Sequence, residues 1–354
     1  MKAVRSIIIV SVMITIILSS CCPARNECAP KGWTKEKAND WYRQKGWQSG
    51  CNYIPATAIN TIEMWQEESF DPATIDKELG WAEEIGFNTM RVFLNSLVWK
   101  NDKDGFKKRV QQYLEISESH KISAIFVFFD DCWNEESALG KQPEPKPGVH
   151  NSGWVQDPAR SLRSDTVKLN SELEEYVKDI VATFKDDERV LMWDLYNEPG
   201  PGSIALLKNA YKWVREINPS QPLTSGINNL DHIEINNFRL QNSDVITYHD
   251  YGGTEEEVYW IKFLKLYERP LICTEYLRRN FGCNFENILP LFRQNNVGAI
   301  NWGFVSGKTN TMFGWDDPRP DGKEPEVWFH DILRQDKTPF DPKETEIIRK
   351  VNTK

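Results

Sequence analysis

Two short apolar runs of this sequence each end on a glutamate. The segment MWDLYNEPG spans residues 192–200 and carries Glu198, and the segment LICTEY spans residues 271–276 and carries Glu275. Such runs are typical of strands that are buried on both faces, as in a parallel sheet covered by helices. A carboxylate at the carboxyl end of such a strand lies at the rim where barrel enzymes build their sites. The sequence therefore predicts that Glu198 and Glu275 face one pocket.

A pair of carboxylates in one pocket indicates a particular chemistry. Hydrolysis of a glycosidic bond needs one protonated carboxyl to release the leaving oxygen and one ionised carboxylate beside the anomeric carbon. In a retaining enzyme the ionised group attacks the sugar directly. We expect no cofactor and no metal, because the two carboxylates supply all the proton and nucleophile chemistry.

The elements that must position these glutamates alternate along the chain. Short apolar runs are separated by segments with helical spacing, for example the amphipathic pattern from Leu169 to Phe184 and the helix predicted over Ile204 to Ile217. This alternation indicates repeated βα units. The eight predicted strands are Cys51–Tyr53, Thr89–Leu94, Ser123–Phe129, Val190–Tyr196, Pro222–Ser225, Val245–His249, Pro270–Tyr276 and Ala299–Phe304.

Eight such units predict an α/β fold of the (β/α)₈ TIM-barrel class with a single catalytic domain. The predicted strands span about 250 residues, which is the usual size of such a barrel. Two long connections follow predicted strands, at residues 130–163 and 305–326, and we expect both on the catalytic face. The last segment, residues 327–354, is predicted to close the fold as a helical cover.

Further strand-end motifs resemble those of clan A glycoside hydrolases, most closely family 5, which includes cellulases, mannanases and xylanases. The resemblance covers about residues 50–315 and rests on motifs in register at several strand ends. They are Asn197-Glu198-Pro199, Glu275, Arg91 in Asn88-Thr89-Met90-Arg91-Val92, His249 and Tyr251 in His249-Asp250-Tyr251, and Trp302 in Asn301-Trp302-Gly303.

The resemblance implies a role for each of these residues. Glu198 would be the acid/base and Glu275 the nucleophile. Arg91 and Tyr251 would hold Glu275 ionised and lower its pKa, whereas the neighbouring negative charge would raise the pKa of Glu198. His249 would contact Glu198. Asn197 would bind the sugar 2-hydroxyl, and Trp302 would lie under the sugar ring.

One departure from the family pattern concerns the sugar. Many members place a histidine near the end of the third strand, where this chain has Asp130, Asp131 and Trp133. The two aspartates would contact sugar hydroxyls or a cation, or would cap a loop. Other residues considered for the cleft are His150, Asn151 and Trp154 in the following loop, and Asn52, Trp65 and Trp99, which we expect to be structural rather than functional.

The N-terminus reads as an export signal. Lys2 and Arg5 precede an apolar stretch from Ile7 to Leu18, which is short for a membrane span of about 20 residues. The sequence Leu18-Ser19-Ser20-Cys21 resembles the lipobox of bacterial lipoproteins. We therefore expect a lipoprotein signal peptide at residues 1–20, a lipid anchor on Cys21, a tether at residues 21–31 and the catalytic domain at residues 32–354. The alternative is an ordinary signal peptide with a chance cysteine.

The amino-acid composition limits which binding partners are expected. The net charge of −9 argues against nucleic acid, which needs a basic surface. The 14 tryptophans suit sugar stacking, although most tryptophans in any fold are core residues. The seven cysteines lack the close spacing of a zinc site, and their pairing cannot be deduced from sequence. Cys273 lies within a predicted strand and reads as a small buried apolar residue.

These observations predict a retaining glycoside hydrolase that acts on a β-linked glycan. It would be a monomer anchored by lipid to the bacterial cell envelope, at the outer membrane or cell surface. An endo-β-1,4-glycanase such as a mannanase, xylanase or glucanase is favoured. The alternatives are an exo-acting β-glycosidase, which closed loops around a pocket would indicate, and a non-catalytic glycan-binding lipoprotein. The last class usually lacks one of the two glutamates, and both are present here.

Overall fold

The computed structural model describes residues 32–164 and 166–353. Its centre is one sheet of eight strands whose paired neighbours all run parallel, in the order β5-β4-β3-β2-β1-β8-β7-β6. The strands are β1 (Ser49–Asn52), β2 (Thr89–Phe93), β3 (Ser123–Asp130), β4 (Val190–Asn197), β5 (Leu223–Thr224), β6 (Ile246–His249), β7 (Leu271–Glu275) and β8 (Gly298–Trp302). This is the predicted (β/α)₈ barrel, and each predicted strand appears within one or two residues of its expected bounds.

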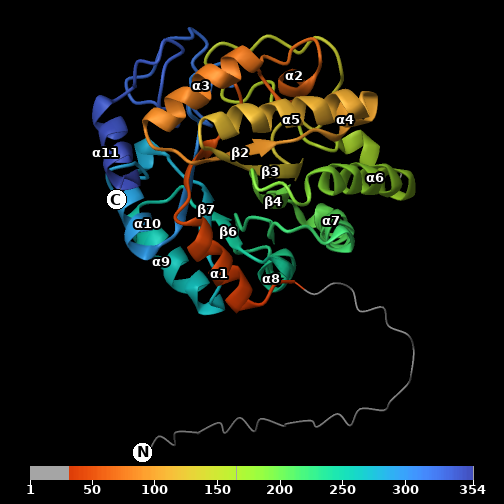
Figure 1. The fold of residues 1–354 in the computed structure, drawn as a ribbon. Helices are drawn as coiled ribbons and strands as arrows, with labels where there is room; N and C mark the ends of the chain where they lie inside the picture. The colour runs from red at the N-terminus through yellow and green to blue at the C-terminus, as the bar shows by residue number, and fades with distance from the viewer. Residues whose placement is uncertain (1–31, 165, 354) are drawn as a thin grey trace, which may run out of the picture.

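Helices cover the outside of the sheet (Figure 1). The α-helices of the described residues are α1 (Lys35–Lys45), α2 (Thr61–Trp65), α3 (Pro72–Glu84), α4 (Ser96–Asn101), α5 (Lys103–Ser119), α6 (Thr166–Phe184), α7 (Ile204–Ile217), α8 (Ile233–Asn242), α9 (Thr254–Leu264), α10 (Leu289–Asn295) and α11 (Pro342–Asn352).

Helical periodicity in the sequence explains how these helices pack. In α6 the side chains of Leu169, Leu173, Val177 and Ile180 recur at three- and four-residue spacing, and all are buried. The predicted helix over residues 204–217 matches α7, which ends where Asn218 takes up a left-handed backbone conformation with φ of 55°. The apolar stripe of each helix therefore sets which face it turns to the sheet.

The interior of the barrel has its own apolar core at the amino-terminal end of the strands. Ile125, Met192, Ile272 and Ile300 come from β3, β4, β7 and β8 and form one buried cluster with Tyr42 of α1. The helix α1 therefore closes this end of the barrel. The opposite end, where the strands finish, is left for the site.

The ladder of backbone hydrogen bonds does not close between β5 and β6. At this seam the hydroxyls of Thr224 and Thr247 lie 2.8 Å apart, and Ile227 forms an isolated bridge with Tyr248. The strand β5 has only two residues, so it is too short to pair along β6. The barrel is thus nearly closed, and Ile227, just after β5, completes this side by donating to the carbonyl of Thr247 at 3.0 Å and accepting from the N–H of His249 at 2.8 Å.

Two expectations about the rest of the chain have different outcomes. The closing segment contains one helix, α11, whereas residues 327–341 are irregular, so the predicted helical cover is only partly helical. Among the described residues the four cysteines are free, and Cys273 is buried within β7 as predicted. The signal peptide, Cys21 and the tether fall outside the described residues. No helix within residues 32–164 and 166–353 is long and apolar enough to cross a membrane.

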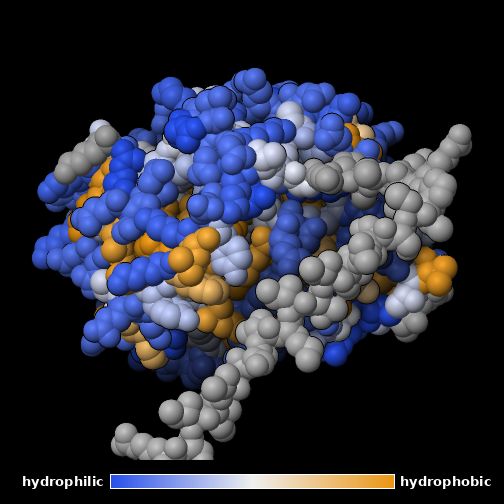
Figure 2. Space-filling view, turned by 90° about the horizontal axis from the view of Figure 1, so that it is seen from below, coloured by the Kyte–Doolittle hydropathy of each residue, from blue (hydrophilic) through white to orange (hydrophobic). Residues whose placement is uncertain are grey.

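The face of the molecule seen in Figure 2 is mainly hydrophilic. Figure 2 views the molecule from below the orientation of Figure 1 and shows hydrophilic side chains around a smaller group of hydrophobic ones. Scattered exposed apolar residues, such as Tyr259 of α9 and Leu266 just after it, are ordinary for a protein surface. The concentration of chemistry-bearing residues lies instead at the carboxyl ends of the strands.

Candidate active site

Arg91 of β2 stands at the centre of the strand ends and is fully buried. Its Nε donates to Asp194 at 2.9 Å, and Nη1 donates to Asn52 at 2.7 Å and to Glu275 at 2.8 Å. Its Nη2 donates to the side-chain oxygen of Asn197 at 2.7 Å. One guanidinium therefore holds side chains from β1, β4 and β7 in fixed positions, which its planar set of donors allows.

Glu275 closes β7 and is almost completely buried. Its Oε1 accepts from Arg91, and its Oε2 accepts from the hydroxyl of Tyr251 at 2.7 Å. The Nδ1 atom of His249 lies 3.6 Å from the same Oε2. These contacts fix the carboxylate with one oxygen on each of two donors, an arrangement that orients a nucleophile.

Glu198 follows the end of β4 in a left-handed backbone conformation, with φ of 46°. Its Oε1 lies 2.7 Å from Nδ1 of His249, and its Oε2 accepts from the thiol of Cys132 at 3.5 Å. The side chain of Glu198 is 26% exposed, compared with 6% for Glu275. Of the two glutamates, Glu198 is thus the one that meets solvent.

The two glutamates and His249 converge on one point. One carboxylate oxygen of Glu198, one of Glu275 and one ring nitrogen of His249 all lie within 4.8 Å of one another. Three such ligands could also suit a metal ion. However, the Arg91 guanidinium lies 2.8 Å from Glu275 and would repel a cation there, and both oxygens of Glu275 already accept hydrogen bonds. The set therefore fits proton and nucleophile chemistry better than metal binding.

The expected directions of the two pKa shifts are wrong. Burial raises the pKa of Glu275 above its ordinary value of 4.5, and the nearby Glu198 adds to this, so His249, Arg91 and Tyr251 only partly offset the loss of solvent. Burial also acts on Glu198, but the hydrogen bond and charge of His249 outweigh it and lower the pKa of this carboxyl. Sequence reasoning counted charges and could not weigh burial against the His249 contact.

Asn197 is oriented from two sides. Its oxygen accepts from Arg91, and its Nδ2 donates to Asp130 at 2.9 Å and to the sulfur of Cys132 at 3.5 Å. Asp130 also accepts from Trp154 at 2.7 Å, and burial raises the pKa of this aspartate to about 7. Asp130 thus positions Asn197, and the contact of its second amide hydrogen with sulfur is the weaker of the two.

These side chains open into a cleft of about 460 Å³ at the carboxyl ends of the strands. Asn197, Glu198, Tyr251, Glu275 and Trp302 all line it. Arg91 and His249 lie just beneath through the contacts described above. The structure therefore brings together all seven residues that the sequence pointed to: Arg91, Asn197, Glu198, His249, Tyr251, Glu275 and Trp302.

The less specific candidates divide into two groups. Trp133, His150 and Asn151 line the cleft, and the rings of Trp133 and His150 stack with centroids 5.2 Å apart. Trp65 and Trp99 lie elsewhere, since Trp65 donates to the backbone of Phe93 and Trp99 donates to Asp179.

Asp131 is also outside the cleft. It accepts from the backbone of Gly200 at 2.9 Å and from Ser203 at 2.6 Å, and Arg163 lies 2.7 Å away. This aspartate therefore anchors the loop after β4, which matches the loop-capping alternative.

Sequence reasoning missed four residues that line the cleft: Cys132, Asn228, Trp315 and Asp316. The ring of Trp315 meets that of Tyr251 edge-on, with centroids 4.9 Å apart. Its only signal was its position in the long loop after β8. Cys132 was considered for disulfides and zinc, but its place directly after β3 would have indicated the site.

A wall of three loops bounds the cleft on one side. We use "loop wall" for residues 53–60 after β1, 131–159 after β3 and 303–341 after β8. Backbone hydrogen bonds join these loops, from Asn151 to Thr309 at 2.7 Å, from Lys308 to Ala56 at 3.0 Å and from Arg319 to Gly148 at 2.9 Å. Gly148 has a φ of 66°, and a Cβ there would lie 1.8 Å from the carbonyl oxygen of Arg319, so this approach requires glycine.

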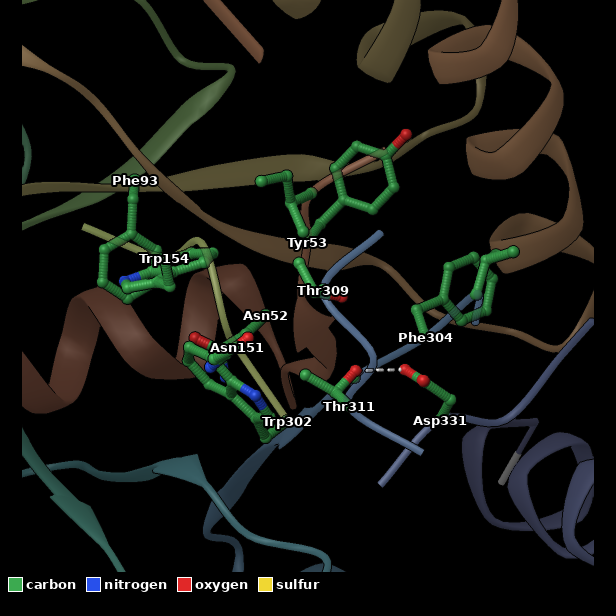
Figure 3. A pocket seen from close by; sticks show the side chains of 13 residues that line it. Asn52, Tyr53, Phe93, Asn151, Trp154, Trp302, Phe304, Thr309, Thr311 and Asp331 are labelled. Carbon is green, nitrogen blue, oxygen red and sulfur yellow. Dashed lines mark hydrogen bonds between the residues drawn. The ribbon is translucent and has the colours of Figure 1, made fainter. Parts of the chain in front are cut away.

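A small pocket lies next to Trp302 and is lined in large part by the loop wall (Figure 3). The pocket offers only about 20 Å³, roughly the room that one water molecule needs. In Figure 3, Asn151 and Trp302 lie towards one end of it, and the hydrogen-bonded pair Thr311 and Asp331 lies towards the other. Asn151 and Trp302 line both this pocket and the cleft. We call it the end pocket.

Comparison with known proteins gives matches of two kinds. The family model described as "Cellulase (glycosyl hydrolase family 5)" matches residues 48–304. A search of curated proteins found no match.

Solved structures with a similar fold include a family 5 mannosidase from Rhizomucor miehei, with 12% identity, a TM-score of 0.56, and 86% of this chain and 92% of that chain covered. An endo-β-1,4-mannanase from Thermotoga petrophila has 12% identity and a TM-score of 0.57, with 88% and 77% covered. The exo-β-1,4-mannosidase Op5Man5 from Opitutaceae bacterium strain TAV5 has 18% identity and a TM-score of 0.61, with 87% and 59% covered. At these identities the likeness shows the shared fold.

Proposed function

Because this chain belongs to glycoside hydrolase family 5, we propose that it cleaves β-glycosidic bonds with retention of configuration, using Glu275 as nucleophile and Glu198 as acid and base. The observation that carries this proposal is the approach of the two carboxylates to within 4.8 Å at the ends of β4 and β7. Retaining enzymes hold their carboxyl groups about 5–5.5 Å apart, whereas inverting enzymes need about 6.5–9.5 Å to admit a water molecule.

In the first step a carboxylate oxygen of Glu275 attacks the anomeric carbon, and the bond to the leaving oxygen breaks. Glu198 gives its proton to that oxygen, and a covalent sugar–Glu275 ester remains. The 2.7 Å contact with Nδ1 of His249 holds the carboxyl of Glu198 in place for this transfer. A bound sugar would also remove the remaining solvent from Glu198, which favours its protonated form.

In the second step a water molecule attacks the anomeric carbon and gives a proton to Glu198, while Glu275 is released. Formation of the ester has removed the negative charge of Glu275, so Glu198 is free to act as the base. Arg91 and Tyr251 then receive the returning carboxylate in its original hydrogen bonds. Asn197, held by Arg91 and Asp130, is placed to donate to the sugar 2-hydroxyl.

The configuration of the first product tests this mechanism. Hydrolysis of an aryl β-glycoside followed by proton NMR should give the β-anomer first, with the α-anomer appearing only through mutarotation. An initial α-anomer would contradict the proposed roles and favour inversion. The variant Glu275→Gln, which keeps the shape of the side chain without its charge, serves as the inactive control.

We further propose that the enzyme removes single sugars from chain ends, although sequence reasoning favoured an endo-acting glycanase. Glu198, the proposed acid, follows β4 and would protonate the leaving oxygen, so the leaving group would extend from the β4 side of the cleft. Trp302 ends β8, which lies opposite β4 in the strand order, so the retained sugar extends towards β8. On that side, among the described residues, the loop wall lines the end pocket next to Trp302, which offers only about 20 Å³. This arrangement supports room for one sugar on the retained side.

The names of the similar structures favour β-mannosides as the first substrates to test. They include a mannosidase, a mannanase and an exo-β-1,4-mannosidase. Digestion of β-1,4-mannohexaose and of the glucose and xylose counterparts should release monosaccharide as the first product. Early release of disaccharides or longer pieces from the interior would contradict the exo mode and favour the endo-glycanase.

We also propose that the protein acts as a monomeric lipoprotein of the bacterial cell envelope. The support is the sequence Leu18-Ser19-Ser20-Cys21 after an apolar stretch, with a short tether before the domain. Such an anchor would hold the enzyme at the surface where extracellular or periplasmic glycans arrive. A non-catalytic glycan-binding protein is disfavoured, because Glu198 and Glu275 are both present with their hydrogen-bond partners.

A further inference from the structure

The amide of Asn151 is the least satisfied polar group beside the cleft. The residue is 1% exposed, and both its side-chain oxygen and its side-chain nitrogen lack a hydrogen-bond partner among the described residues. A buried amide in this condition costs free energy, so it is expected to have a partner when the protein works. Asn151 lines the cleft and the end pocket at once, so that partner would come from one of these spaces.

The backbone of Asn151 is held firmly in place. Its N–H donates to the carbonyl of Thr309 at 2.7 Å, and its carbonyl accepts from the N–H of Trp154 at 3.1 Å. The φ of 46° is a conformation that asparagine tolerates better than most residues. The side chain is therefore presented from a fixed point in the loop wall, which favours selective binding over loose contact.

The position of Asn151 relative to the reacting atoms decides what it would meet. Glu275 acts on carbon 1 of the retained sugar, and the ring lies over Trp302. The end pocket is lined by Trp302 and Asn151 but not by Glu275. In a pyranose the carbon opposite carbon 1 is carbon 4, so a ring over Trp302 with carbon 1 at Glu275 would turn its far edge away from Glu275, towards the end pocket. That edge carries the 3- and 4-hydroxyls, each able to donate and accept a hydrogen bond, as an amide can.

We propose that Asn151 binds the free 3- and 4-hydroxyl groups of the chain-terminal sugar and so selects chain ends. The inference rests on the proposed glycosidase function and names the group that would enforce its exo mode. A 4-hydroxyl that carries another sugar cannot be accommodated, because the end pocket has room for little more than a hydroxyl. Asn151 is thus a specificity-determining residue, distinct from the carboxylates that carry out the reaction.

The test compares kcat/KM for the wild type and a variant, each measured with a parent glycoside and with an analogue that lacks one hydroxyl. The substrates are the 4-nitrophenyl β-glycoside that the wild type cleaves best and its 3-deoxy and 4-deoxy analogues. The protein change is Asn151→Gly, which removes the amide and tolerates the positive φ, and Asn151→Asp provides a second variant of the same shape. The control is Thr311→Val at the other end of the end pocket, which removes the hydroxyl that donates to Asp331.

We expect the wild type and Thr311→Val to lose about tenfold or more in kcat/KM when the hydroxyl recognised by Asn151 is missing from the sugar. For the Asn151→Gly variant, the kcat/KM values of the deoxy and parent glycosides should differ by about twofold or less. An equal deoxy penalty in the wild type and Asn151→Gly would overturn the proposal and leave Asn151 satisfied by bound water alone. If the wild type cleaves no aryl β-glycoside, the proposed function itself fails, and the two failures are thereby distinguished. Thermal unfolding of each variant would show that it is folded.

Discussion

Arg91 and Glu275 lie in direct contact, with guanidinium Nη1 donating to Oε1 at 2.8 Å, although they come from strands that are not neighbours in the sheet. The same guanidinium reaches Asp194, Asn52 and Asn197. A single side chain therefore sets the relative positions of Glu275 and of Asn197, which precedes Glu198. Lysine cannot replace this fork, because its ammonium group is a point charge on a flexible stem.

We predict that Arg91→Lys retains the fold and loses most of its activity. A charge-assisted hydrogen bond contributes roughly 1.5–3 kcal/mol, so kcat/KM should fall by about 10- to 100-fold or more. Kinetics on an aryl β-glycoside, with circular dichroism to monitor folding, would measure this. Activity within about threefold of wild type would remove Arg91 from the site.

Chemical rescue can test the different roles proposed for the two glutamates. Glu198→Ala should keep the first step for substrates with good leaving groups, which need no acid, and azide should then speed turnover and yield a β-glycosyl azide. Glu275→Ala should lose the first step for every substrate, and azide should there give the α-glycosyl azide. The reverse pattern would exchange the two roles.

Cys132 is predicted to lower the pKa of Glu198. Its thiol donates to Oε2 of Glu198, a contact that favours the ionised carboxyl and lowers its pKa after the larger effects of burial and His249. In Cys132→Ala the alkaline limb of the kcat/KM profile should therefore move to higher pH. In Cys132→Ser, a stronger donor should move it to lower pH, each by roughly 0.3–1 pH unit. Shifts in the same direction for both variants would indicate a purely structural effect.

Glu78 of α3 predicts a pH-dependent stability. It accepts from Tyr53 at 2.9 Å and from the backbone of Ala56, and burial raises its pKa to about 7. The folded state holds this proton more tightly than the unfolded state, so the stabilisation is complete below about pH 4.5 and is lost as the pH rises through about 7. Between pH 4.5 and pH 7 the free energy of unfolding of Glu78→Gln should rise relative to that of the wild type by up to roughly 3 kcal/mol. The free energies of unfolding would be measured with denaturant at several pH values. If they changed with pH in parallel for the wild type and Glu78→Gln, the prediction would be wrong.

Cys21 is predicted to be acylated. Cells supplied with labelled palmitate should label the wild-type protein, whereas Cys21→Ser should remain unlabelled and be released from the membrane fraction. The matched control is Cys22→Ser, which alters the adjacent cysteine and should still be labelled. Equal labelling of wild type and Cys21→Ser would favour an ordinary signal peptide.

The barrel could be predicted from the sequence because each strand is marked by a pattern within a few consecutive residues. Each buried strand is a short apolar run, and a polar residue at its end falls at the rim of the sheet, as Glu198 and Glu275 do. The loops were harder, because their partners are distant in the chain. Asp131 and Cys132 are neighbours, yet one anchors Gly200 and the other contacts Glu198. Nothing local distinguishes these two directions.

The electrostatics of the site were also beyond the sequence. Whether Glu198 or Glu275 has the higher pKa depends on burial and on the 2.7 Å contact to His249, neither of which a motif specifies. The closed side of the cleft was likewise invisible, since it depends on hydrogen bonds between residues more than 150 positions apart, such as Asn151 and Thr309.

The loop wall has a consequence for how the enzyme would work along a polymer. In the proposed exo mode, the sugar cut from the chain end would lie deeper than the remaining chain, and both would leave through the same opening. The shortened chain would then dissociate before the monosaccharide leaves, and it would not slide forward for another cut. Each sugar removed would require a separate encounter, so degradation would be distributive rather than processive.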